Sequence, residues 1–309
     1  MKQLPLHAFF RAPATRAPPI AKTGKRKFID FFCGCGGASQ GAAQAGFDVV
    51  LAIDYCQDAL RVHKLNHRSA VHLCTPLPAP FELPLPSPGE DWHLHGSPPC
   101  THLSQANIER DPSAKADALK MVKWFLEFCM SCGATTWTME NVATKATIEL
   151  LEAFRSAHRQ KVAYAIVQCN DHGLPTTRRR LIAGSPRVIA AFRRLPHAHR
   201  TVRDVVRTPR GTHTRGSVVW AGHKEYKHYG PNDALHSIDK PAPCITARHT
   251  LFWATPKLGN PLVKMTPRET AIVQTFPKDY ALDTSISRAI RQLGNSFPPS
   301  VAERLFSCC

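Results

Sequence analysis

The chain has 309 residues and a formal net charge of +17, which is long enough to bury a full hydrophobic core and excludes a small peptide scaffold. No apolar run approaches the length that crosses a bilayer, so we expect no membrane association. The excess of positive charge therefore predicts nucleic acid as the polyanionic partner.

The first 29 residues contain seven Lys or Arg, no acidic residue and several prolines, a composition typical of a disordered basic arm. We place this arm at 1–26; it is equally consistent with a solubilising tail. The chain shows no secretory signal, and its eleven cysteines are spread along a large chain. We therefore expect reduced thiols without disulfides in an intracellular protein, in the cytoplasm or nucleus of a cell or viral host, and not a secreted one.

After the arm, strand and helix patterns alternate along the chain. Apolar runs of strand type occupy 27–32, 49–53, 70–73, 92–95, 135–139, 163–167 and 181–183, and helical patterns occupy 38–45, 57–65, 115–130 and 146–158. Six prolines between 76 and 88 predict a loop. The alternation predicts an α/β fold with a doubly wound, mostly parallel sheet, in which ligands bind at the carboxyl ends of the strands.

The composition changes after residue 186. Residues 187–240 contain eleven Lys or Arg and four acidic residues, with aromatic and histidine residues between them and no helical periodicity. We therefore expect a small, irregular β and loop subdomain at 186–265 beside a main domain at 27–185. Three further helical patterns, at 267–276, 286–293 and 300–306, predict that residues 266–309 return to the main domain.

A glycine cluster follows the first strand, at 33–37, and Asp54 follows the second. Glycines between a strand and a helix let the backbone approach a ligand closely, and an acid at the next strand end is placed to accept the hydroxyls of a ribose. The pair of features favours a cofactor that contains a nucleoside. The alternative interpretation of these features is a glycine turn and a surface aspartate.

A single thiol follows the fourth main strand, in the pentapeptide Gly96-Ser97-Pro98-Pro99-Cys100. Two consecutive prolines stop the strand and give the backbone a stiff, preset direction. A thiol fixed at the carboxyl end of a strand suggests nucleophilic chemistry, although on this pentapeptide alone an inert core cysteine is the simpler interpretation. Cys129 and Cys132 form a lone pair with zinc-type spacing, and we expect no metal site.

Five short motifs in their order and spacing resemble those of the DNA (cytosine-5) methyltransferases, and the resemblance covers about residues 27–307. The motifs are Phe32-Cys33-Gly34-Cys35-Gly36-Gly37, Gly96-Ser97-Pro98-Pro99-Cys100, Glu140-Asn141-Val142, Gly173-Leu174-Pro175 leading into Arg178 and Arg180, and Gly294-Asn295-Ser296. The resemblance implies a Rossmann-like catalytic domain that uses S-adenosylmethionine, and it assigns 186–265 to target recognition.

The resemblance implies that Cys100 adds to C6 of cytosine and that Glu140 binds N3 and the exocyclic amine. Because cytosine C5 is a poor nucleophile, this addition must come before methyl transfer. A basic cleft would lower the pKa of the thiol. Arg178 and Arg180 would contact cytosine O2 or nearby phosphates. Since a stacked base is out of reach, the target would be flipped out of double-stranded DNA, with 101–111 as the closing loop.

The resemblance also implies a cofactor site. Phe32 would lie against the adenine, and Gly34 and Gly36 would let the methionine moiety come close. Asp54 would bind the ribose, and Asn295 and Ser296 would help to close the site. The expected cofactor residues are Phe32, Gly34, Gly36, Gly37, Asp54, Tyr55, Pro98, Asn295 and Ser296. We expect the enzyme to be a monomer.

Two positions depart from the family pattern. Thr176 replaces a glutamine, and Cys74-Thr75-Pro76 offers no acid for the adenine amine. Two alternative functions stay open. One is a tRNA cytosine-5 methyltransferase, although the chain lacks the Cys-Phe-Thr tripeptide of those relatives. The other is a DNA-binding relative without turnover, against which the presence of both Cys100 and Glu140 argues.

Overall fold

The structure is a computed structural model that describes residues 15–16, 26–78, 81–82, 90–100, 103, 111–158, 161–206, 217–219, 235–247, 250–254 and 262–309. Most of the expected arm at 1–26 lies outside these residues. Its described part includes the two-residue strand β1 (Thr15–Arg16), which pairs in parallel with β5 (Phe81–Glu82). The proline-rich segment 76–88 therefore contains one short strand and is not entirely a loop.

A seven-stranded sheet in the order β4-β3-β2-β6-β7-β10-β8 forms the centre of the molecule. Its strands are β2 (Lys27–Phe31), β3 (Asp48–Asp54), β4 (Val71–Cys74), β6 (Trp92–Gly96), β7 (Thr136–Asn141), β8 (Ala163–Gln168) and β10 (Arg179–Gly184). All are parallel except β10, which is antiparallel to both of its neighbours. The predicted α/β fold with a mostly parallel, doubly wound sheet is confirmed.

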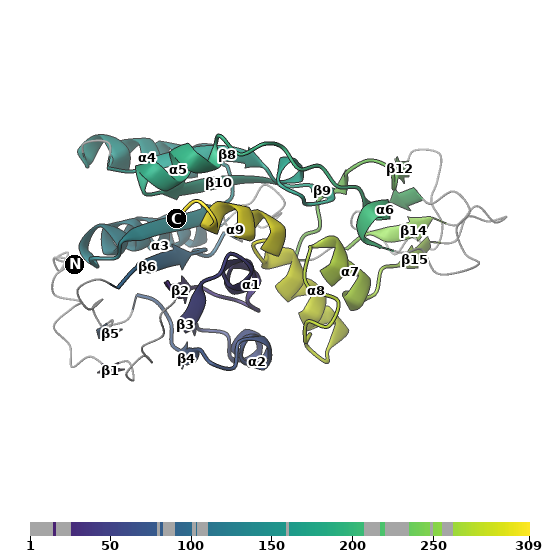
Figure 1. Ribbon diagram of the computed structural model, residues 1–309, viewed down its shortest axis with the longest axis horizontal. Coiled ribbons are helices and arrows are strands. Elements are labelled where there is room, and N and C mark those ends of the chain that lie inside the picture. Colours follow the sequence, from purple (N-terminus) through teal and green to yellow (C-terminus); the bar gives the residue numbers. More distant parts are fainter. Residues whose placement is uncertain are drawn as a thin grey trace.

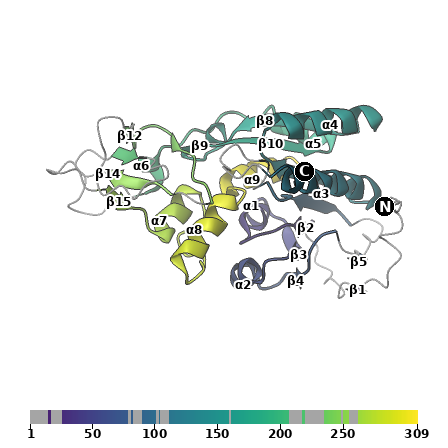
Figure 2. The same cartoon turned by 180° about the vertical axis from the view of Figure 1, so that it is seen from behind.

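Helices cover both faces of this sheet (Figures 1 and 2). Strand periodicity explains the two layers, because side chains of β2 alternate between faces. The ring of Phe28 contacts Phe306 at 4.8 Å between centroids, and Phe31 contacts Phe128 on the opposite face at 5.1 Å. The first face carries α1 (Gly37–Gln44), α2 (Gln57–Asn66), α5 (Pro186–Phe192) and α9 (Pro299–Phe306), and the second carries α3 (Pro112–Ser131) and α4 (Lys145–Ala157).

A second, four-stranded antiparallel sheet lies at one end of the molecule (Figure 1). Its order is β12-β11-β14-β15, formed by β11 (Ser217–Val219), β12 (Leu235–Ser237), β14 (Phe252–Ala254) and β15 (Leu262–Lys264). Residues of α6 (Val202–Val205), of α7 (Pro267–Val273) and of this sheet share one apolar core. Helix α5 packs on β8 and β10 of the central sheet, so residues 186–192 lie with the main domain and not beyond the predicted boundary.

Two elements connect the small sheet to the large one. The first is β9 (Thr176–Thr177), which follows the 3₁₀ helix η2 (Cys169–Asp171) in the chain and pairs in parallel with β13 (Ala242–Pro243). Helix α8 (Ile286–Asn295) is the second and lies between the two sheets in both views.

All eleven cysteines are free thiols. In the described part of the chain, no helix is both long and apolar enough to cross a membrane.

Candidate active site

A cavity of about 290 Å³ lies at the carboxyl ends of the parallel strands, between β2, β3, β6, β7 and α8. It brings together residues from all parts of the sequence. Except for Gly36, Arg178 and Arg180, all the expected site residues line it, namely Phe32, Gly34, Gly37, Asp54, Tyr55, Pro98, Cys100, Glu140, Asn295 and Ser296. One cavity thus holds both the expected nucleophile and the expected cofactor residues.

The glycine loop forms one wall of this cavity, and its glycines have different roles. Gly34 has φ +54°, and a Cβ built there meets no described atom within 4 Å. Gly36 has φ +98°, and its Cβ would lie 2.5 Å from the hydroxyl of Tyr280. The Cβ of Gly37 would lie 2.2 Å from the carbonyl oxygen of Phe297. Gly34 therefore leaves space for a ligand, whereas the other two permit close packing.

Asp54 ends β3 beside this loop. Its Oδ2 accepts a hydrogen bond from the Gly34 amide at 2.8 Å, and its Oδ1 accepts one from the Cys56 amide at 2.8 Å. Burial raises the pKa of this carboxyl group, and the backbone hydrogen bonds partly offset that increase. The adjacent Tyr55 exposes 68% of its surface. The open space at Gly34, the carboxylate and the exposed ring fit a cofactor with a nucleoside and an amino-acid moiety.

Among the described residues, the end of β4 supplies no acid to the cavity, whereas Asp58 of α2 lines it. Cys74 ends β4 as an exposed thiol, and its Sγ lies 3.6 Å from the carbonyl oxygen of Tyr55. It is absent from the residues that line the cavity. The departure in the sequence therefore corresponds to a strand end that contributes no carboxylate to the cavity.

Cys100 follows the stiff exit from β6. Asn141 donates from Nδ2 to the carbonyl oxygen of Pro98 at 3.1 Å, and the Leu103 amide donates to the Cys100 carbonyl at 2.9 Å. Burial and, to a smaller extent, the Glu140 carboxylate raise the pKa of the Cys100 thiol, and the two arginines only partly offset this. The expectation that a basic cleft lowers this pKa is wrong, because desolvation outweighs the positive charges.

Glu140 lies at the end of β7 and is 3% exposed. Its Oε1 forms an ion pair with Nε of Arg180 at 2.7 Å. Because β10 is antiparallel to β7 and pairs Ile182 with Glu140, Arg180 lies just beyond the end of β7 and reaches the carboxylate from the neighbouring strand. Arg180 therefore contacts the site through Glu140.

Arg178 is buried away from the cavity, with 2% of its surface exposed. Its Nη1 donates to the carbonyls of Ile245 at 3.3 Å and Gly294 at 3.0 Å, and its Nη2 donates to that of Ser296 at 3.0 Å. Both Nη atoms are thus bonded to backbone carbonyls, and the contact of Arg178 with cytosine or phosphate stays a prediction. Arg178 fastens the small subdomain to the C-terminal segment. Thr176 nearby is also fully buried.

Sequence reasoning missed one wall of the cavity. Arg288, Arg291 and Gln292 line it together with Asn295. Arg291, Gln292 and Asn295 lie three, four and seven positions after Arg288 on α8, so the helical repeat puts all four on one face. That spacing is visible in the sequence and is the signal by which they could have been found.

The doubly wound sheet, the nucleoside-type cavity and the thiol beside a paired carboxylate define an enzyme that transfers a group from a nucleoside-containing cofactor. The model of the C-5 cytosine-specific DNA methylases matches residues 26–203 and 199–309, and the chain belongs to this family. It is therefore a DNA (cytosine-5)-methyltransferase, with S-adenosylmethionine as methyl donor.

Curated relatives match nearly the whole chain. The type II methyltransferase M.HgiDI of Herpetosiphon aurantiacus is 24% identical over 89% of this chain and 91% of its own length. M.HindV of Haemophilus influenzae is 25% identical over 90% of this chain and 94% of its own length. A putative DNA modification methyltransferase encoded within an Escherichia coli prophage has the same fold, with a TM-score of 0.62, 19% identity, and coverage of 92% and 98%.

Proposed function

We propose that this chain methylates C5 of cytosine in double-stranded DNA through a covalent bond between Cys100 and C6 of a flipped base. The observation that carries the proposal is the single cavity that contains Cys100 and Glu140 together with Gly34 and Asp54. A base that enters beside the thiol would thus lie next to the bound cofactor. Such proximity converts a reaction between two substrates into one within a single complex.

In this mechanism the Cys100 thiol loses its proton, and its sulfur adds to C6. Glu140 accepts a hydrogen bond from the exocyclic amine and holds a proton against N3, where negative charge develops. S-adenosylmethionine supplies an electrophilic methyl group to C5. Loss of the C5 proton and elimination of the Cys100 thiolate then restore the aromatic ring.

The neighbours of these two residues support their roles. The ion pair with Arg180 fixes the orientation of the Glu140 carboxylate. The Asn141 side chain hydrogen-bonds the Pro98 carbonyl, which connects the end of β7 to the segment that carries Cys100. Both reacting groups are thereby attached to rigid strand ends.

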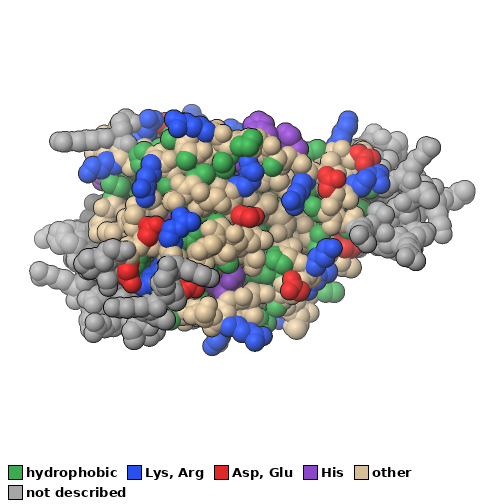
Figure 3. All heavy atoms as spheres, in the orientation of Figure 1, with side chains coloured by type: hydrophobic (Ala, Val, Ile, Leu, Met, Phe, Trp, Pro, Cys, Tyr) green, Lys and Arg blue, Asp and Glu red, His purple; other side chains and the backbone are tan. Residues whose placement is uncertain are grey.

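The basic residues support duplex DNA as the substrate. The chain carries a net charge of +17, and Lys and Arg side chains are spread over the face that Figure 3 shows. We propose that 186–265 contributes the contacts to bases and that 101–111 closes over the site. Most of 101–111, including Ser104, Gln105 and Asn107, lies outside the described residues. We also propose that the enzyme is intracellular and monomeric and that it methylates cytosine within one short sequence.

The test is methyl transfer to duplex DNA that presents cytosine in every sequence context, with wild type beside Cys100→Ser. Cys56→Ser is a matched control, because Cys56 also lines the cavity but is not the proposed nucleophile. We expect 5-methylcytosine from wild type and the control, and a covalent adduct of both with 5-fluorocytosine DNA. No product from wild type in any context would refute the proposal. Faster methylation of tRNA in a parallel reaction would make RNA the substrate.

A further inference from the structure

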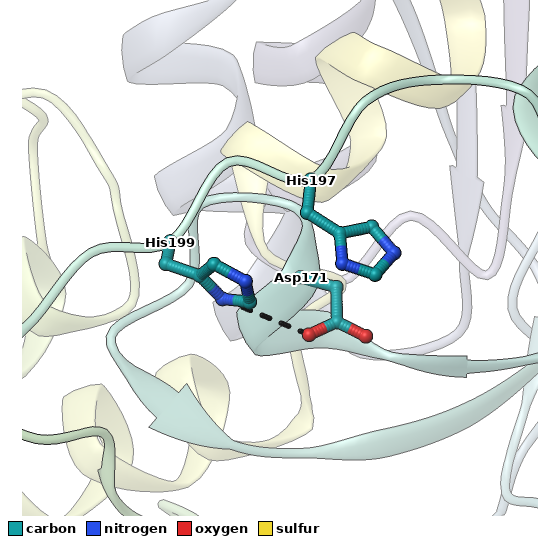
Figure 4. Close-up of side chains that lie close together, drawn as sticks. All are labelled: Asp171, His197 and His199. Atoms are coloured by element: carbon teal, nitrogen blue, oxygen red, sulfur yellow. Dashed lines mark ion pairs between the residues drawn. The ribbon is translucent and has the colours of Figure 1, made fainter.

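A cluster of metal-ligand side chains lies outside the residues that line the cavity, on the connection to the small subdomain. Asp171 ends η2, and His197 and His199 lie between α5 and α6. One ligand atom from each residue lies within 4.8 Å of the other two. Figure 4 shows both imidazoles beside the carboxylate, one on each side of it.

The backbone holds these residues in register. The Ala198 amide donates to the carbonyl oxygen of Asp171 at 2.8 Å, and Ala198 forms a parallel bridge with His172. In such extended backbone, residues i and i+2 point to the same side, so His197 and His199 both face η2. The position of the two imidazoles beside Asp171 is therefore a consequence of strand-type pairing, and not of side-chain rotation alone.

We propose that Asp171, His197 and His199 bind a divalent transition-metal ion of the Zn²⁺ type. Imidazole nitrogens and a carboxylate oxygen are preferred zinc ligands, and two neutral imidazoles with one carboxylate give a donor set of net charge −1. His199 Nδ1 lies 3.7 Å from Asp171 Oδ1. Zinc ligands in a tetrahedron lie about 2.0–2.2 Å from the metal, so small rotations of the three side chains bring them into range.

The surroundings permit these rotations. The side chains of Asp171 and His199 are 27% and 59% exposed, which also gives an ion access. Asn170 Nδ2 donates to Asp171 Oδ1 at 3.2 Å and would orient the ligand from outside, as such partners do in metal sites. The nearby cation Arg304 is already bonded to the carbonyl of Pro196 and to His172 Nδ1.

The bound ion would fasten 193–201, which leads into the small subdomain, to the end of η2. Since η2 precedes β9, Arg178 and Arg180 in the chain, the ion would hold the base of the subdomain against the central sheet. The sequence predicted no metal site, because Asp171 is far from the two histidines along the chain and shows no metal-ligand spacing to them.

The test uses the full chain without an affinity tag. Zn²⁺ affinity is measured by competition with a chromophoric chelator, for wild type, for His197→Ala with His199→Ala, and for the control His158→Ala. We expect one bound equivalent in wild type and control, and binding that is at least about tenfold weaker in the double variant. Zn²⁺ should also raise the melting temperature of wild type but not of the double variant.

The absorption spectrum of the protein with Co²⁺ in place of Zn²⁺ distinguishes metal binding at this site from metal binding by cysteines. A site of two nitrogens and one carboxylate gives visible bands without the intense near-ultraviolet absorption of thiolate ligands. Absence of uptake by wild type, equal affinity in wild type and the double variant, or thiolate absorption in both would overturn the proposal.

Discussion

The buried carboxylate of Glu140 and the guanidinium of Arg180 form an ion pair of 2.7 Å across two antiparallel strands at the edge of the cavity. A charge as buried as that of Glu140 is tolerated only when it is paired or bonded. Arg180 thus makes it possible for a buried ionisable group to stand in the same cavity as Cys100, the proposed nucleophile.

Arg180→Met should lower the rate of methyl transfer about 100-fold, the size of effect expected for a misplaced general acid–base group. It should also destabilise the fold by about 3 kcal/mol, because the carboxylate loses its partner. Single-turnover methylation and urea unfolding measure the two effects. Arg180→Lys is the control and should recover part of the stability. An unchanged rate in a less stable Arg180→Met protein would mean that the pair is only structural.

The reactivity of Cys100 should increase when the negative charge of Glu140 is removed. Burial and that carboxylate raise the pKa of the thiol, so its thiolate fraction is small near neutral pH and grows as pH rises. In Glu140→Gln, the pKa should fall, and iodoacetamide should alkylate Cys100 several-fold faster at pH 7.5. Peptide mass spectrometry separates Cys100 from the other ten cysteines, and the exposed Cys74 serves as internal control. Slower alkylation of the variant would contradict this electrostatic assignment.

Two glycines of the cofactor loop should respond differently to the same substitution. In Gly34→Ala, the added Cβ points into open space, so the cost in stability is only that of a left-handed alanine, about 1 kcal/mol. The methyl group occupies ligand space, however, and should weaken binding of S-adenosylmethionine at least tenfold. In Gly36→Ala, the Cβ meets the Tyr280 hydroxyl at 2.5 Å, and stability should fall further. Equilibrium dialysis and thermal unfolding test the pair, and equal effects of both variants on affinity and stability would count against these roles.

The sequence predicted the elements whose signal is local. Alternating strand and helix patterns identified the parallel sheet, and the expected helix at 57–65 corresponds to Gln57–Asn66. The order of short motifs led to Cys100 and Glu140, which line one cavity. The prediction of the sheet is confirmed, and the two residues share a cavity because strand ends of a parallel sheet converge at one edge; their catalytic roles stay predictions.

The features that the sequence could not predict depend on contacts between distant segments. Arg178 looked like a substrate contact, but its partners are carbonyls at 245, 294 and 296, which only the folded chain brings to it. The pKa of Cys100 depends on how completely the site excludes water, and net charge gives no measure of that. The antiparallel placement of β10 likewise follows from tertiary pairing and not from its apolar run.

Asp30 is a buried carboxyl group on β2 that bonds a residue of α1, the helix that follows the glycine loop. This residue of β2 is 1% exposed, and its Oδ2 accepts a hydrogen bond from the Ser39 hydroxyl at 2.6 Å. Its Oδ1 has no hydrogen-bond partner within the described part of the chain. Burial raises the pKa of Asp30 from 3.8 to about 7. The folded protein therefore keeps this proton over a pH range in which the unfolded chain releases it.

Asp30 should make the protein less stable as pH rises from about 4 to 7, since the folded state binds the extra proton in that range. Asp30→Asn cannot ionise, so its stability relative to wild type should increase by about 2–3 kcal/mol between pH 5 and pH 8, at 1.36 kcal/mol per unit of pKa difference. Urea unfolding at the two pH values measures this change, and any constant effect of the amide cancels. Asp279→Asn, at an exposed carboxylate, is the control. A difference between Asp30→Asn and wild type that stays the same at the two pH values would show that Asp30 is already ionised at pH 5 in the folded protein.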